Sequence, residues 1–331
     1  MRINKELRSL SKVYEITYVG VGTTNDDSYA RDYCKLYYLV IGKRNHPITI
    51  IRQFILVTKL LRRHYDSIHI INEQLMIFFY PLLFRNHLVL DIFDSIFLTL
   101  NKGNNRLKWL KRIIYAPVDK ILVTDQNRKT LMPEFTHPKI RILENYPNRY
   151  TEPIKKNPDP EKITILYNGW LGLNRGTEVI QKILALNRNV HVIMAGWFAD
   201  KASKELAGHP QVDFRGTMSQ QEALKVAAEE ADYILCVYAP LNENNINASP
   251  NKIYDSIQTH TPVIINSEIR ISSFVSENKI GVVINEYNFK NAGALVDELF
   301  RNKNTYTFSR EITEKYVWEN IEDILIEAHQ V

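Results

Sequence analysis

Two basic residues in the second half of the chain occupy positions where positive charge is unfavourable. In the segment SPNKIYDSIQTHTPVI, Ser249 and Pro250 predict the start of a helix, so Lys252 falls in its first turn. Arg175 stands in the loop YNGWLGLNRG, directly before a second predicted helix. The free N–H groups and the dipole of a helix make its N-terminus partly positive, which disfavours a cation there unless an anion binds.

Both segments follow strands of one predicted parallel sheet, whose carboxyl ends meet at the same edge. Two cations converging on that edge would repel each other unless an anion lay between them, and a diphosphate fits this description. Asp255 lies one turn beyond Lys252 and could accept hydrogen bonds from a ribose. A simpler interpretation also remains open, in which Lys252 points to solvent and pairs with Asp255 at a spacing of three residues.

The loop before Arg175 is rich in glycine, which permits tight turns and close approach of the backbone to a ligand. Its spacing is neither the dinucleotide-binding fingerprint nor a P-loop. Glycine also occurs in ordinary loops between strands and helices, so the loop predicts an anion site only in combination with the two cations.

The chain has 331 residues, which predicts about two domains, and its 45% hydrophobic and 24% charged content is typical of a globular protein. The two cysteines, Cys34 and Cys236, lack disulfide or metal-ligand spacing, and no apolar segment is long enough to span a bilayer. We therefore expect a cytoplasmic protein. No metalloenzyme histidine pattern, serine-hydrolase elbow or nucleic-acid-binding module occurs, so we expect no metal, no cofactor and no nucleic-acid partner.

Short apolar strands alternate with amphipathic helices along the whole chain, which predicts parallel α/β sheets. A proline-rich segment without periodicity, residues 145–162, divides this alternation in two and indicates a linker. In the first half we expect strands at 14–20, 67–71, 87–93, 120–124 and 140–145. In the second half we expect strands at 163–169, 190–196, 212–216, 233–238, 261–266 and 281–285, followed by a helical region at about 308–329.

Charge is distributed unevenly between the two halves. Residues 1–153 carry 24 Lys and Arg against 14 Asp and Glu, whereas residues 154–331 carry 18 against 23. Part of the basic excess lies in residues 104–115, where apolar Leu107, Leu110, Ile113 and Ile114 alternate with Arg and Lys. This pattern is typical of an amphipathic helix at the surface of an anionic membrane, and equally of an ordinary helix with a solvated basic face.

Six segments follow in order the landmarks of the C-terminal domain of GT-B glycosyltransferases: YNGWLGLNRG, VIMAGWF, VDFRGTMS, EEADYILCVY, SPNKIYDSIQTHTPVI and ENKIGVVI. The chain resembles most the glycosyltransferase family 4 type that builds bacterial surface polysaccharides. The first half resembles the N-terminal domain of that family more loosely, in RINKELRSLSKVYEITYVG, DIFDS, DKILVTDQNRKTL and ILENYPN, and EKYVWEN resembles the start of its closing helix. The resemblance implies an α/β protein with two Rossmann-like domains whose parallel sheets face a cleft. The expected acceptor domain comprises residues 1–152 and 309–331, and the expected nucleotide-sugar domain comprises residues 153–308.

By position, the resemblance makes Arg175 and Lys252 the ligands of a nucleotide diphosphate and places Asp255 where a glutamate usually holds the ribose. Asn247 stands where the family often has a glutamate that reads the donor sugar, so the sugar is expected near Asn247 and Ser249. The full set of expected donor-binding residues is Gly169, Trp170, Gly172, Arg175, Gly196, Thr217, Asn247, Ala248, Ser249, Asn251, Lys252 and Asp255.

The first half departs from the family pattern in two places. Phe93 occupies the position of the family's donor-contacting histidine, so Asp94 is the nearest candidate for a catalytic role beside Arg175 and Lys252. The family also opens with a strand and a glycine-containing loop before a helix that matches Arg2 onward. Either the start of the chain is truncated or the first domain is degenerate. Without the central strand, we expect strands 14–20 and 87–93 each to expose a backbone edge or to pair in a new order.

The resemblance implies transfer of a sugar, with retention at the anomeric carbon, from a nucleotide diphosphate sugar to a lipid-linked or polysaccharide acceptor. Such a reaction would serve surface or capsular polysaccharide biosynthesis at the inner face of the plasma membrane. Two alternatives remain open. One is a degenerate, non-catalytic partner of another glycosyltransferase, and the other is a sugar-nucleotide epimerase, which would need paired acidic and histidine residues.

Overall fold

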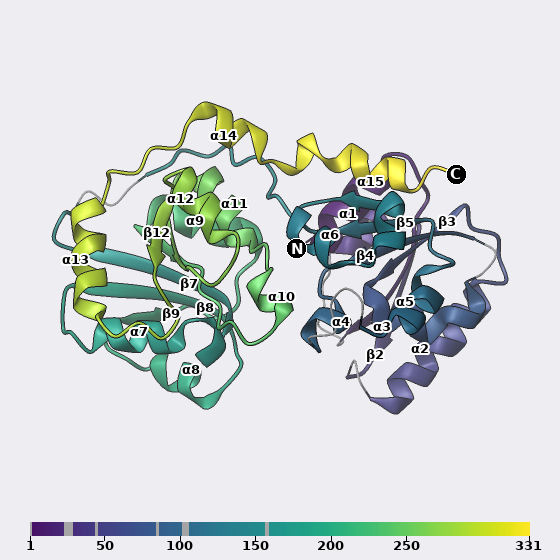
Figure 1. Ribbon diagram of the computed structural model, residues 1–331, viewed down its shortest axis with the longest axis horizontal. Coiled ribbons are helices and arrows are strands. Elements are labelled where there is room, and N and C mark those ends of the chain that lie inside the picture. The colour runs from purple at the N-terminus through teal and green to yellow at the C-terminus, as the bar shows by residue number, and fades with distance from the viewer. Residues whose placement is uncertain (1, 23–28, 44–45, 84–85, 101–105, 156–158) are drawn as a thin grey trace. The chain divides into compact units, whose positions relative to one another are not determined.

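A computed structural model describes residues 2–22, 29–43, 46–83, 86–100, 106–155 and 159–331 of the chain (Figure 1). It divides into two compact units, which we describe separately. Unit 1 comprises Met1–Asn145 and Ile321–Val331, and unit 2 comprises Tyr146–Asn320. Both units are built from parallel strands with helices packed against them.

Unit 2 contains a six-stranded sheet in the order β12-β11-β10-β7-β8-β9, in which every pair is parallel. The first strand, β7, carries apolar residues that are buried on both faces of the sheet, as expected for a strand covered by helices on both sides. The six strands are β7 (Ile163–Leu171), β8 (Val190–Phe198), β9 (Val212–Phe214), β10 (Tyr233–Leu235), β11 (Val263–Asn266) and β12 (Gly281–Ile284).

The helices of unit 2 cover both faces of this sheet (Figure 1). One face buries the largest apolar cluster of the unit, which includes Ile165, Val179, Leu235 and Val296. The helices are α7 (Thr177–Leu184), α8 (Lys201–Leu206), α9 (Gln220–Glu229), α10 (Glu243–Ile246), α11 (Asn251–Thr259), α12 (Ser272–Glu277), α13 (Ala292–Asn302) and α14 (Arg310–Lys315), with 3-10 turns η4 (Leu173–Arg175) and η5 (Trp318–Asn320). Strand β7 therefore lies inside the sheet, between β8 and β10.

Unit 1 contains two separate parallel sheets, β1-β2 and β3-β4-β5-β6. Their strands are β1 (Thr17–Gly22), β2 (Leu36–Ile41), β3 (Ser67–Ile71), β4 (His87–Ile92), β5 (Lys120–Val123) and β6 (Ile140–Ile142). The helices are α1 (Arg2–Leu10), α2 (Pro47–Leu60), α3 (Asn72–Phe79), α4 (Ile96–Thr99), α5 (Lys108–Tyr115), α6 (Gln126–Leu131) and α15 (Glu322–Ala328), with 3-10 turns η1 (Tyr29–Tyr33), η2 (Tyr80–Leu82) and η3 (Glu134–Lys139).

The interruption between the two sheets leaves β1 and β3 as edge strands within the described part of the chain. Within the described residues, the strand at 14–20 has an open edge, whereas the strand at 87–93 has none. Strand β4 pairs with β3 on one side and with β5 on the other, so its backbone hydrogen bonds are satisfied. All six residues of β1 are half-buried, whereas five of the six residues of β4 are buried.

The boundaries of the two units lie at 145/146 and 320/321, whereas the sequence analysis placed them at 152/153 and 308/309. Aromatic packing explains the difference. The ring of Tyr146 lies 4.6 Å from that of Tyr254, and the ring of Tyr316 lies 5.7 Å from the same side chain. Both flanking segments therefore pack on α11 of unit 2, and only Ile321–Val331 returns to unit 1.

The C-terminal segment is held on unit 1 by polar contacts at both of its ends. Near the start of α15, Ser9 donates to the carboxylate of Glu322 over 2.6 Å. At its end, the Nδ1 atom of His329 lies 2.7 Å from Ser67 Oγ, and its Nε2 atom lies 3.0 Å from Nδ1 of His69. Both ring nitrogens of His329 are thus engaged with β3, so the segment is fixed on a strand that has an open edge.

Acidification should weaken this attachment. Burial, together with the neighbouring His69 and His87, lowers the pKa of His329 to about 3. In the unfolded chain a histidine titrates near pH 6.5, so the unfolded state takes up a proton between these values that the folded state does not. The contribution of His329 to the free energy of unfolding is therefore complete above about pH 6.5, and it is lost as the pH drops toward 3.

The free energy of unfolding of the wild type should fall between pH 7.5 and pH 5. We expect this fall to be about 2 kcal/mol smaller in the His329→Gln variant. Urea denaturation of both proteins at the two pH values measures this difference. The subtraction removes contributions from other titrating groups that both proteins share. Equal losses in both proteins would mean that His329 does not titrate as described.

The interrupted sheet should make unit 1 the less stable half. An edge strand has backbone groups that exchange hydrogen through local opening, whereas a central strand opens only with the whole sheet. We expect hydrogen exchange to be faster across residues 1–100 than across residues 163–285, with the fastest strand amides in β1 and β2. Mass spectrometry of peptides, corrected for intrinsic exchange rates, measures this, and β4 provides an internal control. Uniform protection of both halves would contradict it.

Candidate functional site

Three glycines form a row at the carboxyl edge of β7, β8 and β9. Gly169, Gly196 and Gly216 have φ angles of 93°, 143° and 71°, which favour glycine. Gly169 and Gly196 are register partners, and the N–H of Gly196 donates to the carbonyl of Gly216 over 2.7 Å. A Cβ atom on Gly196 would lie 1.8 Å from the carbonyl oxygen of Gly169, whereas a Cβ on Gly169 or Gly216 would meet nothing within 4 Å. The row is therefore bare backbone with open space beside it.

Two tryptophans follow the first two glycines of this row. Trp170 and Trp197 are register partners on β7 and β8, and 58% and 47% of their respective surfaces are exposed. They lie on the same face of the sheet, opposite the face on which Leu171 is buried. The sequence analysis included Trp170 and missed Trp197. The signal was available, since the dipeptide Gly-Trp ends two successive strands.

Arg175 ends the 3-10 turn η4 and points into the interior of unit 2. Its guanidinium carbon lies 4.0 Å from the ring centre of Tyr238, and Nη2 lies 3.4 Å from the side-chain oxygen of Asn245. The Nη1 atom is buried and donates to no partner among the described residues. A buried, charged donor without an acceptor costs free energy, and a bound anion would supply that acceptor.

Lys252 lies in the first turn of α11, which begins at Asn251 with Pro250 as its N-cap. The helix thus starts one residue later than expected, and Ser249 is not its cap. The Nζ atom of Lys252 donates to the carbonyl of Leu235 over 3.0 Å, so the side chain turns toward β10 and not toward solvent. Burial lowers the pKa of Lys252, and the charge of Arg175 lowers it further. The two cations therefore lie close enough to repel each other.

Asp255 lies one turn after Lys252, and its Oδ1 atom accepts a hydrogen bond from Gln220 over 3.1 Å. Asp255 and Lys252 line a small cavity of about 10 Å³ together with Asn168. The side-chain oxygen of Asn168 is buried without a hydrogen-bond partner in the described residues. Three of the residues that line the cavity are polar, and the other four, Leu166, Ala223, Ala227 and Ile234, are apolar.

The remaining expected residues lie around this edge in unit 2. Asn247 is buried, and its amide donates to Glu243 while its Oδ1 atom is without a partner within the described chain. Ser249 Oγ lies 3.2 Å from the hydroxyl of Tyr254, and the N–H of Gly172 donates to the Tyr167 hydroxyl over 2.8 Å. Ala248 is half-buried, whereas Thr217 and Asn251 are exposed.

Asp94 belongs to unit 1, in the loop between β4 and α4. Its carboxylate is exposed, and Oδ1 lies 3.9 Å from Nη2 of Arg128. Its backbone N–H donates to the side chain of Asn72, which also accepts from the N–H of Phe93. Asn72 has a φ of 61°, so this loop is held in a fixed shape by a side chain. The adjacent Phe93 ring lies 4.8 Å from the guanidinium carbon of Arg2.

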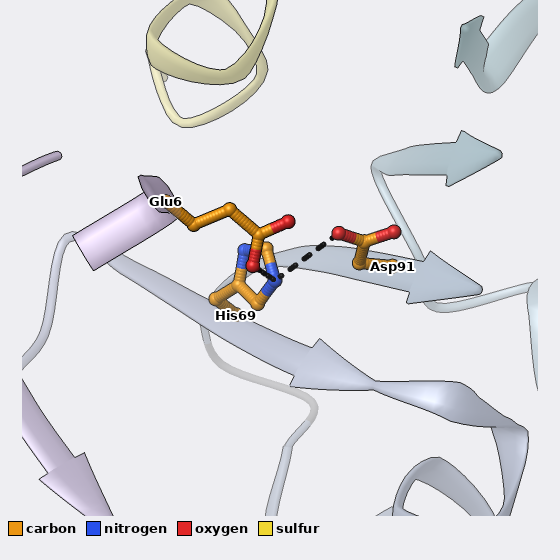
Figure 2. A group of neighbouring side chains, drawn as sticks. All are labelled: Glu6, His69 and Asp91. Atoms are coloured by element: carbon orange, nitrogen blue, oxygen red, sulfur yellow. Dashed lines mark ion pairs between the residues drawn. The ribbon is translucent and has the colours of Figure 1, made fainter. Parts of the chain in front are cut away.

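Glu6, His69 and Asp91 gather in unit 1, with one ligand-type atom from each within 4.8 Å of the others (Figure 2). Arg2 already supplies a cation, because its Nη2 atom donates to both oxygens of Asp91 at 2.8 Å and its Nε atom donates to Glu6 at 2.6 Å. A metal ion would have to sit beside this buried guanidinium, so the residues do not fit a metal site.

The protonation of this cluster supports a structural role. Against burial, the charges of Arg2 and His69 lower the pKa of Glu6, whereas burial raises the pKa of Asp91 well above its usual value. Burial thus disfavours a negative charge on Asp91, and Arg2 lies beside both carboxyl groups. The cluster also lacks the open, solvated acid and histidine that an epimerase would use.

Comparisons with known proteins bear on the fold. No protein-family model and no curated protein matches the chain. Among solved structures, HepE of Anabaena, in complex with UDP and glucose, matches with a TM-score of 0.69 and 13% identity over 98% of this chain and 95% of that one. Sucrose-phosphate synthase of Thermosynechococcus elongatus matches with a TM-score of 0.70 and 13% identity over 98% and 90% of the two chains. The lipopolysaccharide outer core galactosyltransferase WaaB matches with a TM-score of 0.63 and 12% identity over 99% and 94%.

These matches extend over nearly the whole chain and are all to glycosyltransferases or sugar-phosphate synthases of one fold. They agree with the two α/β units and their parallel sheets. The chain therefore has the GT-B fold seen in glycosyltransferases of family 4.

Proposed function

We propose that the protein is a glycosyltransferase that uses a nucleotide diphosphate sugar as its donor. The observation that carries this proposal is the buried Nη1 atom of Arg175, which has no acceptor among the described residues, in the same unit as Lys252, whose pKa is lowered by burial and by the charge of Arg175. A diphosphate provides acceptors for both side chains and removes their mutual repulsion. UDP is the nucleotide to test first, because HepE of Anabaena binds UDP in a similar fold.

In the proposed complex, Asp255 accepts hydrogen bonds from the ribose, and the sugar lies near Asn247, Ala248 and Ser249. The backbone row of Gly169, Gly196 and Gly216, followed by Thr217, would let the nucleotide approach the sheet edge closely. Gly172 and Asn251 complete the loop before η4 and the first turn of α11. Trp170 and Trp197 offer exposed ring faces on which a planar base can stack.

The proposed reaction breaks the bond between the anomeric carbon and the phosphate oxygen and forms a bond from the same carbon to an acceptor hydroxyl oxygen. The hydroxyl proton passes to the departing phosphate, and the sugar keeps its anomeric configuration. Arg175 and Lys252 stabilise the negative charge that grows on the leaving diphosphate, which is a form of preorganised electrostatic catalysis. Asp94 is the candidate for a further polar catalytic role.

The proposed acceptor is a lipid-linked or polysaccharide hydroxyl, as in surface or capsular polysaccharide biosynthesis. A galactosyltransferase of the lipopolysaccharide outer core is among the similar structures. One observation favours a second candidate, a partner that binds nucleotide but does not transfer sugar. The sheet of unit 1 is interrupted between β1 and β3 in the described chain, whereas the sheet of unit 2 is continuous.

We also propose peripheral contact with an anionic membrane through residues 104–115, of which 104 and 105 lie outside the described residues. Helix α5 exposes Trp109 and Ile113 together with the basic Lys108 and Arg112. Lys111 was expected to belong to the basic face of this helix, and this expectation is wrong. Its side chain is buried, and its Nζ atom lies 5.0 Å from the ring centre of Phe97. No helix in the described parts of the chain is long and apolar enough to cross a membrane.

Removing either cation should weaken nucleotide binding. We expect Lys252→Ala and Arg175→Ala each to reduce the binding free energy of UDP by roughly 1.5–3 kcal/mol, the range for hydrogen bonds to charged groups. Isothermal titration calorimetry measures the affinities, and Lys201→Ala, at an exposed site of the same unit, is the control. Wild-type affinity in both variants would exclude the proposed diphosphate site.

Stacking of a base should change tryptophan fluorescence. The chain has four tryptophans, of which Trp318 is buried and Trp109 lies in unit 1. We expect UDP to quench the emission of the wild type and pyrophosphate to leave it nearly unchanged. The double variant Trp170→Phe, Trp197→Phe should lose the quenching, whereas Trp109→Phe should keep it. Quenching that survives in the double variant would place the base elsewhere.

A further inference from the structure

Helix α2 of unit 1 exposes a stripe of three isoleucines. Ile48, Ile51 and Ile55 are 54%, 57% and 62% exposed, and their spacing of three and four residues places them on one face of the helix. The opposite side of α2 contributes Phe54 and Val57 to the core of the unit. The three isoleucines of the stripe therefore do not belong to the hydrophobic core of unit 1. Contiguous exposed apolar surface of this kind marks a site of interaction.

The charges beside the stripe are all of one sign. Arg52 and Lys59 follow Ile48 and Ile55 by four residues each, so they lie on the same exposed face, and Arg62 and Arg63 are exposed just past the end of the helix. The sequence from residue 33 to residue 65 contains no Asp or Glu. A partner for this face must accept isoleucine side chains and balance a dense positive charge at the same time.

Helix α3 packs against α2 and is also joined to α5. The Phe54 ring of α2 packs edge-on against Phe78 of α3 at 5.6 Å, and Phe78 and its neighbour Ile77 are both exposed. Helix α3 is joined to α5 by a hydrogen bond of 3.0 Å from the Tyr115 hydroxyl to Glu73. That glutamate is the only acidic residue in the sequence of α3, and it is buried. Helix α3 thus contacts both α2 and α5.

We infer that the exposed face of α2, together with the neighbouring faces of α3 and α5, docks on a bilayer that contains anionic lipids. Isoleucine side chains enter the boundary between headgroups and acyl chains, and the arginines and lysines meet the negative headgroups. An anionic bilayer accepts apolar side chains and balances positive charge over a broad surface. It therefore matches the charge of this face better than a neutral partner would. The inference adds α2 as a main contact to the one proposed for α5 and does not depend on nucleotide binding.

Sedimentation with vesicles tests the inference. The full chain should bind vesicles of phosphatidylcholine with phosphatidylglycerol at low salt and release as salt rises, because screening weakens the charge attraction. The triple variant Ile48→Ser, Ile51→Ser, Ile55→Ser should lose vesicle binding by roughly tenfold or more, given the apolar surface removed. The variant Arg52→Gln, Lys59→Gln, Arg62→Gln should lose binding to anionic vesicles to a similar extent.

Separate variants distinguish α2 from α5 and from the nucleotide site. The double variant Lys108→Gln, Arg112→Gln reports on α5 alone, and Lys111 is left unchanged because it is buried. Leu241→Ser, at an exposed apolar position of unit 2, is the matched control and should bind vesicles like the wild type. The triple isoleucine variant should keep the wild-type melting temperature and the wild-type shift on adding UDP, so a failure of nucleotide binding would be seen independently.

Two results would overturn the inference. One is vesicle binding of the triple isoleucine variant that equals that of the wild type. The other is a dimer of the wild type in size-exclusion chromatography that dissociates in this variant while vesicles leave both proteins in solution. In the second case the stripe would be an interface between two copies of the chain.

Discussion

Parallel pairing of β7 with β8 and β10 is the constraint on which the candidate site depends. Because neighbouring strands run in the same direction, their carboxyl ends, and the loops that follow them, meet at one edge. Arg175 follows β7, the tryptophan at 197 ends β8, and Lys252 donates to the last residue of β10. None of these residues is near the others in sequence. If any one of these strands ran in the opposite direction, the residue that follows it would lie at the opposite edge of the sheet, and the candidate site would not form.

The same edge shows how glycine and charge act together. The left-handed φ angles at Gly169, Gly196 and Gly216 favour residues without a side chain at the strand ends, and a Cβ atom on Gly169 or Gly216 would meet nothing within 4 Å. A cation near a helix N-terminus and near a second cation is destabilised in the empty site. The burial that lowers the pKa of Lys252 adds to this cost. If the proposed diphosphate binds there, relief of this cost would contribute to its affinity.

Local patterns were sufficient to predict much of this arrangement, and tertiary packing explains what they missed. The strands of unit 2 follow from strand alternation. Strand β2 was missed because LYYLVI is one continuous apolar run without alternation, which does not separate strand from helix. The burial of Lys111 of α5 depends on a contact with Phe97, which belongs to another helix, α4. Exposure of an apolar face, as on α2, is likewise a property of what packs nearby and not of the helix alone.

A buried ion pair between Arg2 and Asp91 connects separate segments of unit 1. Arg2 joins the start of α1 to Asp91 of β4 and to the carbonyl of Leu143, so one side chain ties three segments together. Such a pair gives little net stability but fixes one arrangement, because breaking it leaves a buried charge. It holds α1 beside β4 although β1 and β3 do not pair. The proposed nucleotide site uses residues of unit 2 alone, whereas the proposed sugar transfer would also need an acceptor surface. Binding without transfer is therefore a physically coherent outcome for a chain whose first unit keeps its core but has an interrupted sheet.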